Sequence, residues 1–325
     1  MTHLLVEQPG PATTVQDAGR LAWQHVGVAP GGFADPLLAA LANALVANAP
    51  DAAVLEWTQA GDVLRVVGGS VRVAIAGWTD AQVDGVPVPT FRGLRLHDGQ
   101  TLTVGPLRLG RHGVLAVAGG LQTPLVLGSR ATHARTGVGG QRLAAGNVLP
   151  VLPVDPATAD RVLAESLVPR PQPVVRVLAA PQHTLFTADA LALLVAEPWQ
   201  VLAGDRMGLR LQGPPLRLLP GAEPVSEGVV TGALQVPPSG QPIALGPDRQ
   251  TIGGYAKLAV GITADLRHLA QRTDGATVRF VQVDATAARG ALQQAQAELG
   301  ALLAAMRTAH DVLPHESPRL LHLLS

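Results

Sequence analysis

The sequence predicts a mainly β protein made of two halves, with few helices and one long helix near the C-terminal end. Short apolar runs recur in the first half and again after a proline-rich stretch, and glycine and aspartate residues separate them. This spacing is typical of antiparallel barrels and sandwiches rather than of alternating βαβ units. The 325 residues, 47% of them hydrophobic, supply enough apolar material for two ordinary cores.

The first half contains several runs with the alternating pattern of strands. They are Val63 to Val67, Val71 to Ala76, Gln82 to Val88, Leu94 to Leu96, Thr101 to Val104 and Val114 to Val117. One helix is expected before them, with Asp35 as its N-cap, Pro36 at its first position and an end near Asn48. We expect this helix to cover one mouth of the barrel.

A proline-rich stretch separates the halves, because five prolines fall between Val151 and Pro173. The second half begins with a strand from Val174 to Ala179 and a helix from Thr187 to about Glu197. Further strands are expected around Val201, Arg210, Val229, Ile243, Leu258 and Thr277. The predicted domains are therefore residues 1–152, a linker at 153–173, a second half at 174–284 and a helical extension at 285–325.

The extension has an Ala-, Gln- and Leu-rich run from Ala285 to about Thr308 with apolar residues at helical spacing. Such a pattern predicts a helix packed on its own barrel or a helix that binds a partner. Both interpretations stay open from the sequence.

Composition excludes several classes of function. Lys plus Arg and Asp plus Glu each number 24, so no excess of positive charge indicates a nucleic-acid partner. The chain has no cysteine, which removes disulfides, thiolate nucleophiles and Cys-based zinc sites. No apolar run reaches the roughly 20 residues that cross a bilayer, and the start MTHLLVEQPG lacks the pattern of a secretory signal. We expect a cytoplasmic protein without a membrane partner, and we identify no metal ligands.

Lys257 is the single lysine, and its surroundings exclude two kinds of site. A Walker loop runs from glycine-rich sequence directly into Lys and then Ser or Thr, but Lys257 stands between Ala256 and Leu258. A biotin carrier holds its lysine in a tight turn beside small residues or methionine, and the three methionines lie elsewhere. This chain is therefore expected to carry neither a Walker loop nor covalently attached biotin.

The segment from Ser226 to Leu266 is the strongest candidate site, because Gly, Pro, Gln, Asp and Arg alternate there with short apolar runs. Lysine and arginine could stabilise a developing anion, and a carboxylate could move a proton. We assign Asp248, Arg249 and Lys257 as catalytic candidates. Glutamine both donates and accepts hydrogen bonds, which suits an amide substrate. The substrate-binding candidates in this segment are Gln235, Gln241, Gln250 and Tyr255.

Polar clusters in the first half supply the other candidates. Asp17 and Arg20 share a glycine-containing turn, Asp35 follows closely, and Arg130 lies in an arginine-rich loop that could bind an anion. Asp–Arg pairs in such turns, including Asp205–Arg206, are also typical of ion pairs that only stabilise a turn at the corner of a barrel, without binding a ligand. Glu56 ends an apolar run, so its carboxylate implies either a structural arginine or a role in the site.

Several motifs together resemble one family in order across about the first 280 residues. They are TTVQDAGR, GVAPGGFADPLLAALANALVAN, LAVAGGLQTPLVLGSRAT, GDRMGLRLQG, SEGVVTGALQVPPSGQPIAL and DRQTIGGYAKLA. The chain is similar to the biotin-dependent carboxyltransferase family, which includes the C subunit of 5-oxoprolinase and the subunit 2 type of allophanate hydrolase. The resemblance implies two cyclophilin-like β-barrel halves. It also implies partner subunits A and B, and ATP as the cofactor of their complex.

Three functions follow as expectations. The resemblance favours a subunit of an ATP-dependent 5-oxoprolinase that hydrolyses the lactam of 5-oxoproline to glutamate. The first alternative is a carboxyltransferase component acting with a separate biotin carrier on urea or a similar amide. The second alternative is a non-catalytic regulator that binds another protein.

Overall fold

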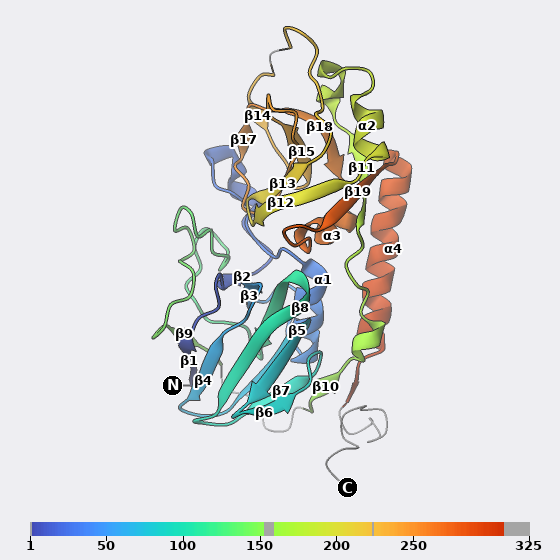
Figure 1. The fold of residues 1–325 in the computed structure, drawn as a ribbon. Helices are drawn as coiled ribbons and strands as arrows, with labels where there is room; N and C mark the ends of the chain where they lie inside the picture. Colours follow the sequence, from blue (N-terminus) through green and yellow to red (C-terminus); the bar gives the residue numbers. More distant parts are fainter. Residues whose placement is uncertain (1, 153–158, 223, 309–325) are drawn as a thin grey trace.

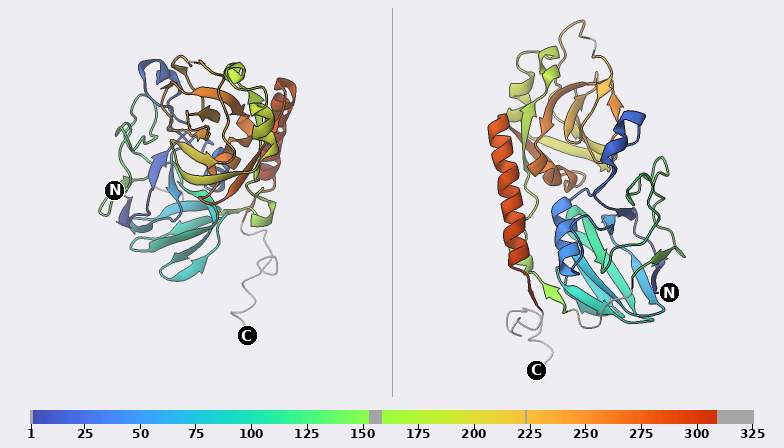
Figure 2. Two further views of the ribbon diagram at one scale, coloured as in Figure 1. Left: turned by 45° about the horizontal axis from the view of Figure 1, so that its top comes forward. Right: turned by 180° about the vertical axis from the view of Figure 1, so that it is seen from behind.

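A computed structural model describes residues 2–152, 159–222 and 224–308. Figure 1 shows two β units, one above the other, with the helix α4 (Ala285–Ala304) running along the side of both. The views in Figure 2 show the same arrangement from above and behind. The mainly β fold with few helices is confirmed. The domain boundaries stay a prediction, and residues 153–158 of the linker and 309–325 of the extension lie outside the described residues.

The first unit is a nine-stranded antiparallel sheet that forms a half-barrel. The strand order of its main part is β2-β3-β8-β4-β1-β9. Outside this series, β5 pairs with β8 and also with β6 and β7. The strands are β1 (His3–Gln8), β2 (Thr14–Gln16), β3 (Val54–Thr58), β4 (Val63–Val67), β5 (Val71–Val83), β6 (Val86–Val88), β7 (Gly93–Leu96), β8 (Thr101–Val117) and β9 (Val148–Pro150).

The expected strands at Thr101 to Val104 and Val114 to Val117 are parts of one strand, β8. The expectation of two strands was wrong because the intervening glycines do not end the strand. Gly110 has φ 81°, a conformation that glycine adopts without steric cost, and the β5–β8 register shifts at several places between Ala76 and Ala81. The ladder therefore bends through bulges instead of stopping.

The helix α1 (Pro36–Leu45) begins as the sequence predicts. Asp35 accepts hydrogen bonds from the amides of Leu37 and Leu38 at 3.1 and 3.3 Å, and Pro36 occupies the first turn. The helix does not cover a barrel mouth as expected. It packs on the face of the sheet that carries Ala74, Ala76, Val114 and Ala116, opposite the main core of that unit.

The second unit is a closed barrel with the strand order β11-β18-β15-β16-β13-β12-β19. Apolar side chains, among them Trp199 and Phe280, fill its core. The strands are β11 (Val174–Ala179), β12 (Trp199–Asp205), β13 (Gly208–Gln212), β15 (Ala233–Val236), β16 (Ile243–Leu245), β18 (Ala256–Gly261) and β19 (Thr277–Gln282). The sequence predicts a barrel strand around Val229. The structure has a two-residue strand there that ends at Gly228 and belongs to a separate ribbon.

Short elements complete both units. A two-stranded ribbon of β14 (Glu227–Gly228) and β17 (Ile252–Gly253) lies beside the barrel, and β10 (Arg161–Val162) pairs with β20 (Arg307–Thr308). The remaining helices are η1 (Leu21–Val26), η2 (Glu165–Leu167), η3 (Pro181–Leu185), α2 (Ala190–Ala196), η4 (Thr263–Asp265) and α3 (Leu266–Ala270).

The helix α4 ends four residues before the predicted end and packs on this chain. It contacts α1 of the first unit and both η4 and β11 of the second, and Leu302 is buried in the cluster that surrounds α1. Of the two interpretations of its pattern, packing on its own chain is confirmed. Among the described residues, no helix is long and apolar enough to cross a membrane.

Candidate functional site

The candidate site is built around three consecutive residues, Asp248, Arg249 and Gln250, in the loop between β16 and β17. Asp248 and Arg249 are almost fully buried. Backbone contacts hold the loop in place: the amide of Asp248 donates to the carbonyl of Arg206 at 2.9 Å, and His133 Nε2 donates to the Asp248 carbonyl at 3.1 Å. The three side chains enter three different surroundings.

Asp248 points toward the junction of the two units, where it meets Arg206. Arg206 comes from the β12–β13 turn, and its Nε and Nη2 donate to the two Asp248 oxygens at 3.0 and 2.9 Å. Its Nη1 also pairs with Glu56 Oε1 on β3, and its Nη2 donates to the carbonyl of Gly32 at 2.6 Å. One guanidinium therefore ties the barrel, the Asp248 loop and the first sheet together.

Burial and charge act against each other in this cluster. Burial raises the pKa of Glu56, although Arg206 and the amide of Ala34, which donates to Oε2 at 2.7 Å, lower it in part. Burial by itself would lower the pKa of Arg206, but the carboxylates of Glu56 and Asp248 raise it above its ordinary value. Burial, helped by Arg206 and Arg111, lowers the pKa of the neighbouring His112 to about 3. Arg206 is charged and His112 is neutral at neutral pH.

The Arg249 side chain points toward η1, where only some of its guanidinium nitrogens have hydrogen-bond partners. Its Nη2 donates to Gln24 Oε1 at 2.8 Å, while its Nε and Nη1 are buried and have no hydrogen-bond partner among the described residues. Burial lowers the pKa of this guanidinium. Arg20, just before η1, likewise has a buried Nη1 without a partner in the described part of the chain. Unpaired buried donors are rare in proteins, so these atoms call for a ligand or another acceptor.

Gln250 faces the outside of the barrel. Its Nε2 donates to Gln235 Oε1 at 3.2 Å. Gln235 lies opposite Lys257 on the neighbouring strand, so both side chains project from the same face, away from the barrel core. Lys257 Nζ lies 2.9 Å from an oxygen of Glu227, whose side chain is 52% exposed. Gln235 Nε2 is buried and has no partner among the described residues.

The other sequence candidates lie apart from this cluster or serve local structure. Asp17 holds its own loop, accepting from Gly19 N, Ser129 Oγ and Arg130 N at 2.6 to 2.8 Å. The guanidinium of Arg130 binds the carbonyl of Thr123.

Asp35 caps α1 and joins the units through Arg267 and Gln271, at 3.2 and 2.9 Å. Gln241 bonds to both backbone groups of Gly213 at 2.9 and 3.0 Å. Tyr255 is half-exposed beside the ribbon. These contacts give Asp35 and Gln241 structural roles, and Tyr255 stays an open candidate.

Sequence reasoning misses several residues of the site. The sequence around Arg206 is typical of an Asp–Arg pair that stabilises a turn at a barrel corner, although the carboxylate of Glu56 already implies either a structural arginine or a role in the site. Glu227 lies inside the segment that we selected, and only its distance to Lys257 identifies it. No local signal indicates Gln24, which lies 225 residues from Arg249 in the chain.

Two cavities lie near Arg206. One, of about 580 Å³, is lined by Asp248, His133, Arg135 and Arg142 among others. Asp248 is the residue among the sequence candidates that lines it. In the described ranges, no cluster of three or more His, Asp or Glu residues is placed to hold a metal ion.

The fold and the site define a two-unit β protein in which one loop presents buried hydrogen-bond donors, suited to a small molecule that carries acceptors. The chain belongs to the family described as "Carboxyltransferase domain, subdomain A and B", whose model matches residues 26–282.

Named relatives agree with this family. The chain is 34% identical to the C subunit of 5-oxoprolinase from Escherichia coli (strain K12) over 301 residues, which cover 90% of this chain and 95% of that protein. It is 27% identical to "Urea amidolyase" of Saccharomyces cerevisiae over 314 residues, 89% of this chain but 17% of that protein. The solved Kluyveromyces lactis urea amidolyase matches with a TM-score of 0.83 at 26% identity, over 92% of this chain and 20% of that one.

Proposed function

We propose that this chain is a subunit of an ATP-dependent 5-oxoprolinase and binds 5-oxoproline at the Asp248–Gln250 loop, together with partner subunits A and B. The similarity to the C subunit of 5-oxoprolinase over nearly the whole length of both chains supports this assignment. The match to urea amidolyase covers a small part of a much longer protein, so its support for that activity is weaker.

The observation that carries the proposal is the set of buried donors without acceptors, on Arg249 and Gln235. 5-Oxoproline has a carboxylate and a lactam carbonyl, which accept hydrogen bonds, and one lactam N–H, which donates. A guanidinium suits the carboxylate, because it can donate two parallel hydrogen bonds. The Gln235–Gln250 amide pair offers both donors and acceptors, which suits a lactam.

Hydrolysis of the lactam requires water to attack the carbonyl carbon, the C–N bond to break and the amine to gain a proton. Lys257 would stabilise negative charge on the carbonyl oxygen during that attack. Three carboxylates among the sequence candidates, Asp17, Glu56 and Asp248, are already engaged by hydrogen bonds or by Arg206. Glu227 is the better candidate, because it is exposed and lies beside Lys257.

Bound ATP would supply a phosphoryl group to the lactam oxygen with release of ADP, which would activate the carbonyl carbon toward water and let that oxygen leave as inorganic phosphate. On this proposal ATP binds at a surface shared with a partner subunit, because the surroundings of Lys257 on β18 are not those of a Walker loop. The same strand position, buried in a ladder, does not suit covalent attachment of biotin.

The test is reconstitution of the chain with subunits A and B and measurement of glutamate and ADP release from 5-oxoproline. The proposal expects turnover that needs all three chains and falls at least 10-fold with Arg249→Met. The matched control is Arg210→Met, an exposed arginine on β13, which should keep full turnover. Absence of turnover with all three chains present contradicts the proposal.

A carboxyltransferase is the second candidate function, and the family description together with the urea amidolyase relatives favours it. On this alternative the same donors would bind urea or a similar amide, while a separate carrier protein brings carboxybiotin. Transfer of labelled carboxylate from a biotinylated carrier to urea, with no ATP-dependent release of glutamate from 5-oxoproline, would select this alternative.

A further inference from the structure

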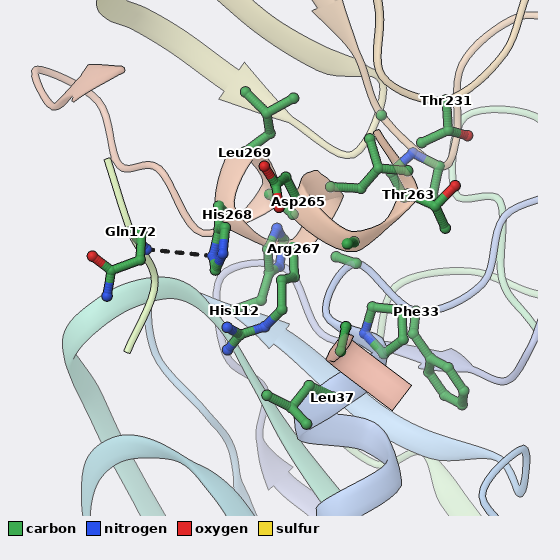
Figure 3. Close-up of a pocket in the computed structure, with 18 of the residues that line it drawn as sticks. Phe33, Leu37, His112, Gln172, Thr231, Thr263, Asp265, Arg267, His268 and Leu269 are labelled. Carbon is green, nitrogen blue, oxygen red and sulfur yellow. Dashed lines mark hydrogen bonds between the residues drawn. The ribbon is translucent and has the colours of Figure 1, made fainter. Parts of the chain in front are cut away.

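A cavity of about 600 Å³ lies between the two units and under α4, and Gly246 and Pro247, which directly precede the Asp248–Gln250 loop, form part of its wall. Figure 3 shows Phe33, Leu37 and His112 of the first unit in the lower part of the view, and Thr263, Arg267, His268 and Leu269 of the second unit above them. One face of α4 completes its wall through Ala291, Ala295 and Leu299. This volume is in the usual range for small-molecule sites, which often lie between domains.

The α4 wall lies outside the family match, which ends at residue 282. Of the wall residues on α4, Ala291 is buried, while Ala295 and Leu299 are half-buried. Small alanine side chains leave space between the helix and the barrel, whereas larger side chains there would fill it. The cavity therefore depends on a helix that lies beyond residues 26–282, the range that the family model matches.

Four charged side chains of the cavity wall, Arg176, Arg206, Asp265 and Arg267, are paired with opposite charges. Arg267 Nε lies 3.2 Å from Asp35, Arg176 donates to Asp265 at 2.6 and 2.9 Å, and Arg206 is held by two carboxylates. His112 and His268 are uncharged at neutral pH, because burial, the largest cause in each case, lowers their pKa values to about 3 and about 4. An ionic ligand would find no unpaired counter-charge among these groups and would lose its hydration. The other charged wall residues, Arg170, Asp205 and Glu298, are exposed to solvent, where water screens their charge.

One wall residue, His268, offers an N–H hydrogen-bond donor. His268 Nδ1 accepts from the amide of Gln172 at 3.3 Å, so in the neutral ring Nε2 carries the proton. The hydroxyls of Thr231 and Thr263 also line the cavity and can donate. Leucine, phenylalanine, proline and alanine side chains make up much of the rest of the wall.

We propose that this cavity binds a small, uncharged, mainly apolar molecule that carries a hydrogen-bond acceptor such as a carbonyl. The molecule lies between α3 and α4, and its binding does not depend on 5-oxoproline turnover.

The environment-sensitive dye Prodan tests the proposal, because it is neutral, aromatic and carries one carbonyl. Saturable binding with a blue-shifted emission is the expected result. Ala295→Trp fills the cavity and should weaken binding at least 10-fold, whereas Ala297→Trp, exposed on the same helix, should not change it. Emission that never saturates, or equal binding by the two variants, overturns the proposal.

A second measurement does not rely on a bulky substitution. Because the chain has no cysteine, Ala295→Cys and Ala297→Cys each introduce a unique thiol. Prodan should slow alkylation of the thiol at position 295 and leave the rate at position 297 unchanged. Equal alkylation rates at position 295 with and without saturating Prodan would overturn the proposal.

Discussion

Replacing Arg206 with methionine tests the junction of the two units. The change leaves Glu56 and Asp248 buried without their shared cation, and breaking a buried pair in this way costs about 3–5 kcal/mol. The loss should also depend on pH. Glu56 has a raised pKa in the folded protein, so the stability linked to its proton is present below its unfolded pKa, about 4.3, and is lost as pH rises through the folded pKa.

Without Arg206 the pKa of Glu56 should rise further, because the arginine lowers it in the native protein. The variant therefore loses more stability at pH 8 than at pH 5, where Glu56 can bind a proton. Urea unfolding followed by tryptophan fluorescence, to which Trp57 and Trp199 contribute from the two cores, measures both values. A loss below about 1 kcal/mol at pH 8, a larger loss at pH 5, or a loss equal to that of Arg210→Met would refute this reasoning.

Three further predictions concern single residues. Arg249→Met should lower kcat/KM for 5-oxoproline about 10- to 100-fold, since a charge-assisted hydrogen bond contributes about 1.5–3 kcal/mol, and steady-state assays of the reconstituted enzyme check it. Asp35→Ala removes a helix cap and a buried acceptor for two side chains, so urea unfolding should show a loss of about 2–4 kcal/mol; a loss under about 0.5 kcal/mol would argue against the bridge. Gly139→Ala should destabilise far more than Gly146→Ala: both have positive φ, but a Cβ at 139 overlaps Ala131 O and Arg20 Nη2, whereas at 146 it meets nothing within 4 Å. Equal melting temperatures of the two variants would contradict that packing.

The fold class could be predicted from the sequence because alternation and turn residues are local signals. The start of α1 is one example, since Asp35 and Pro36 are adjacent to the helix they begin. The course of β8 could not be predicted in the same way. Whether a glycine ends a strand or forms a bulge depends on the partner strand, and β5 comes from elsewhere in the sequence.

The site was predictable to the extent that its residues are neighbours in the chain. Asp248, Arg249 and Gln250 stand together in a polar segment, and the structure places them in one loop with three separate surroundings. Arg206 was not predictable as their anchor, because its partner Glu56 is 150 residues away. The position of Glu56 at the end of an apolar run implies either a cation partner or a role in the site, but the choice and the identity of the partner require the three-dimensional fold.

The single lysine allows a direct measurement of the central claim, that 5-oxoproline binds at the Asp248–Gln250 loop, where Gln250 contacts Gln235 and Lys257 lies opposite Gln235. If only this chain is labelled with ¹⁵N- and ¹³C-lysine and assembled with subunits A and B, the side-chain spectrum contains one lysine, Lys257. The account predicts that this signal shifts saturably with 5-oxoproline and far less with proline, which lacks the lactam carbonyl. An unchanged lysine signal in a complex that turns over 5-oxoproline would contradict it.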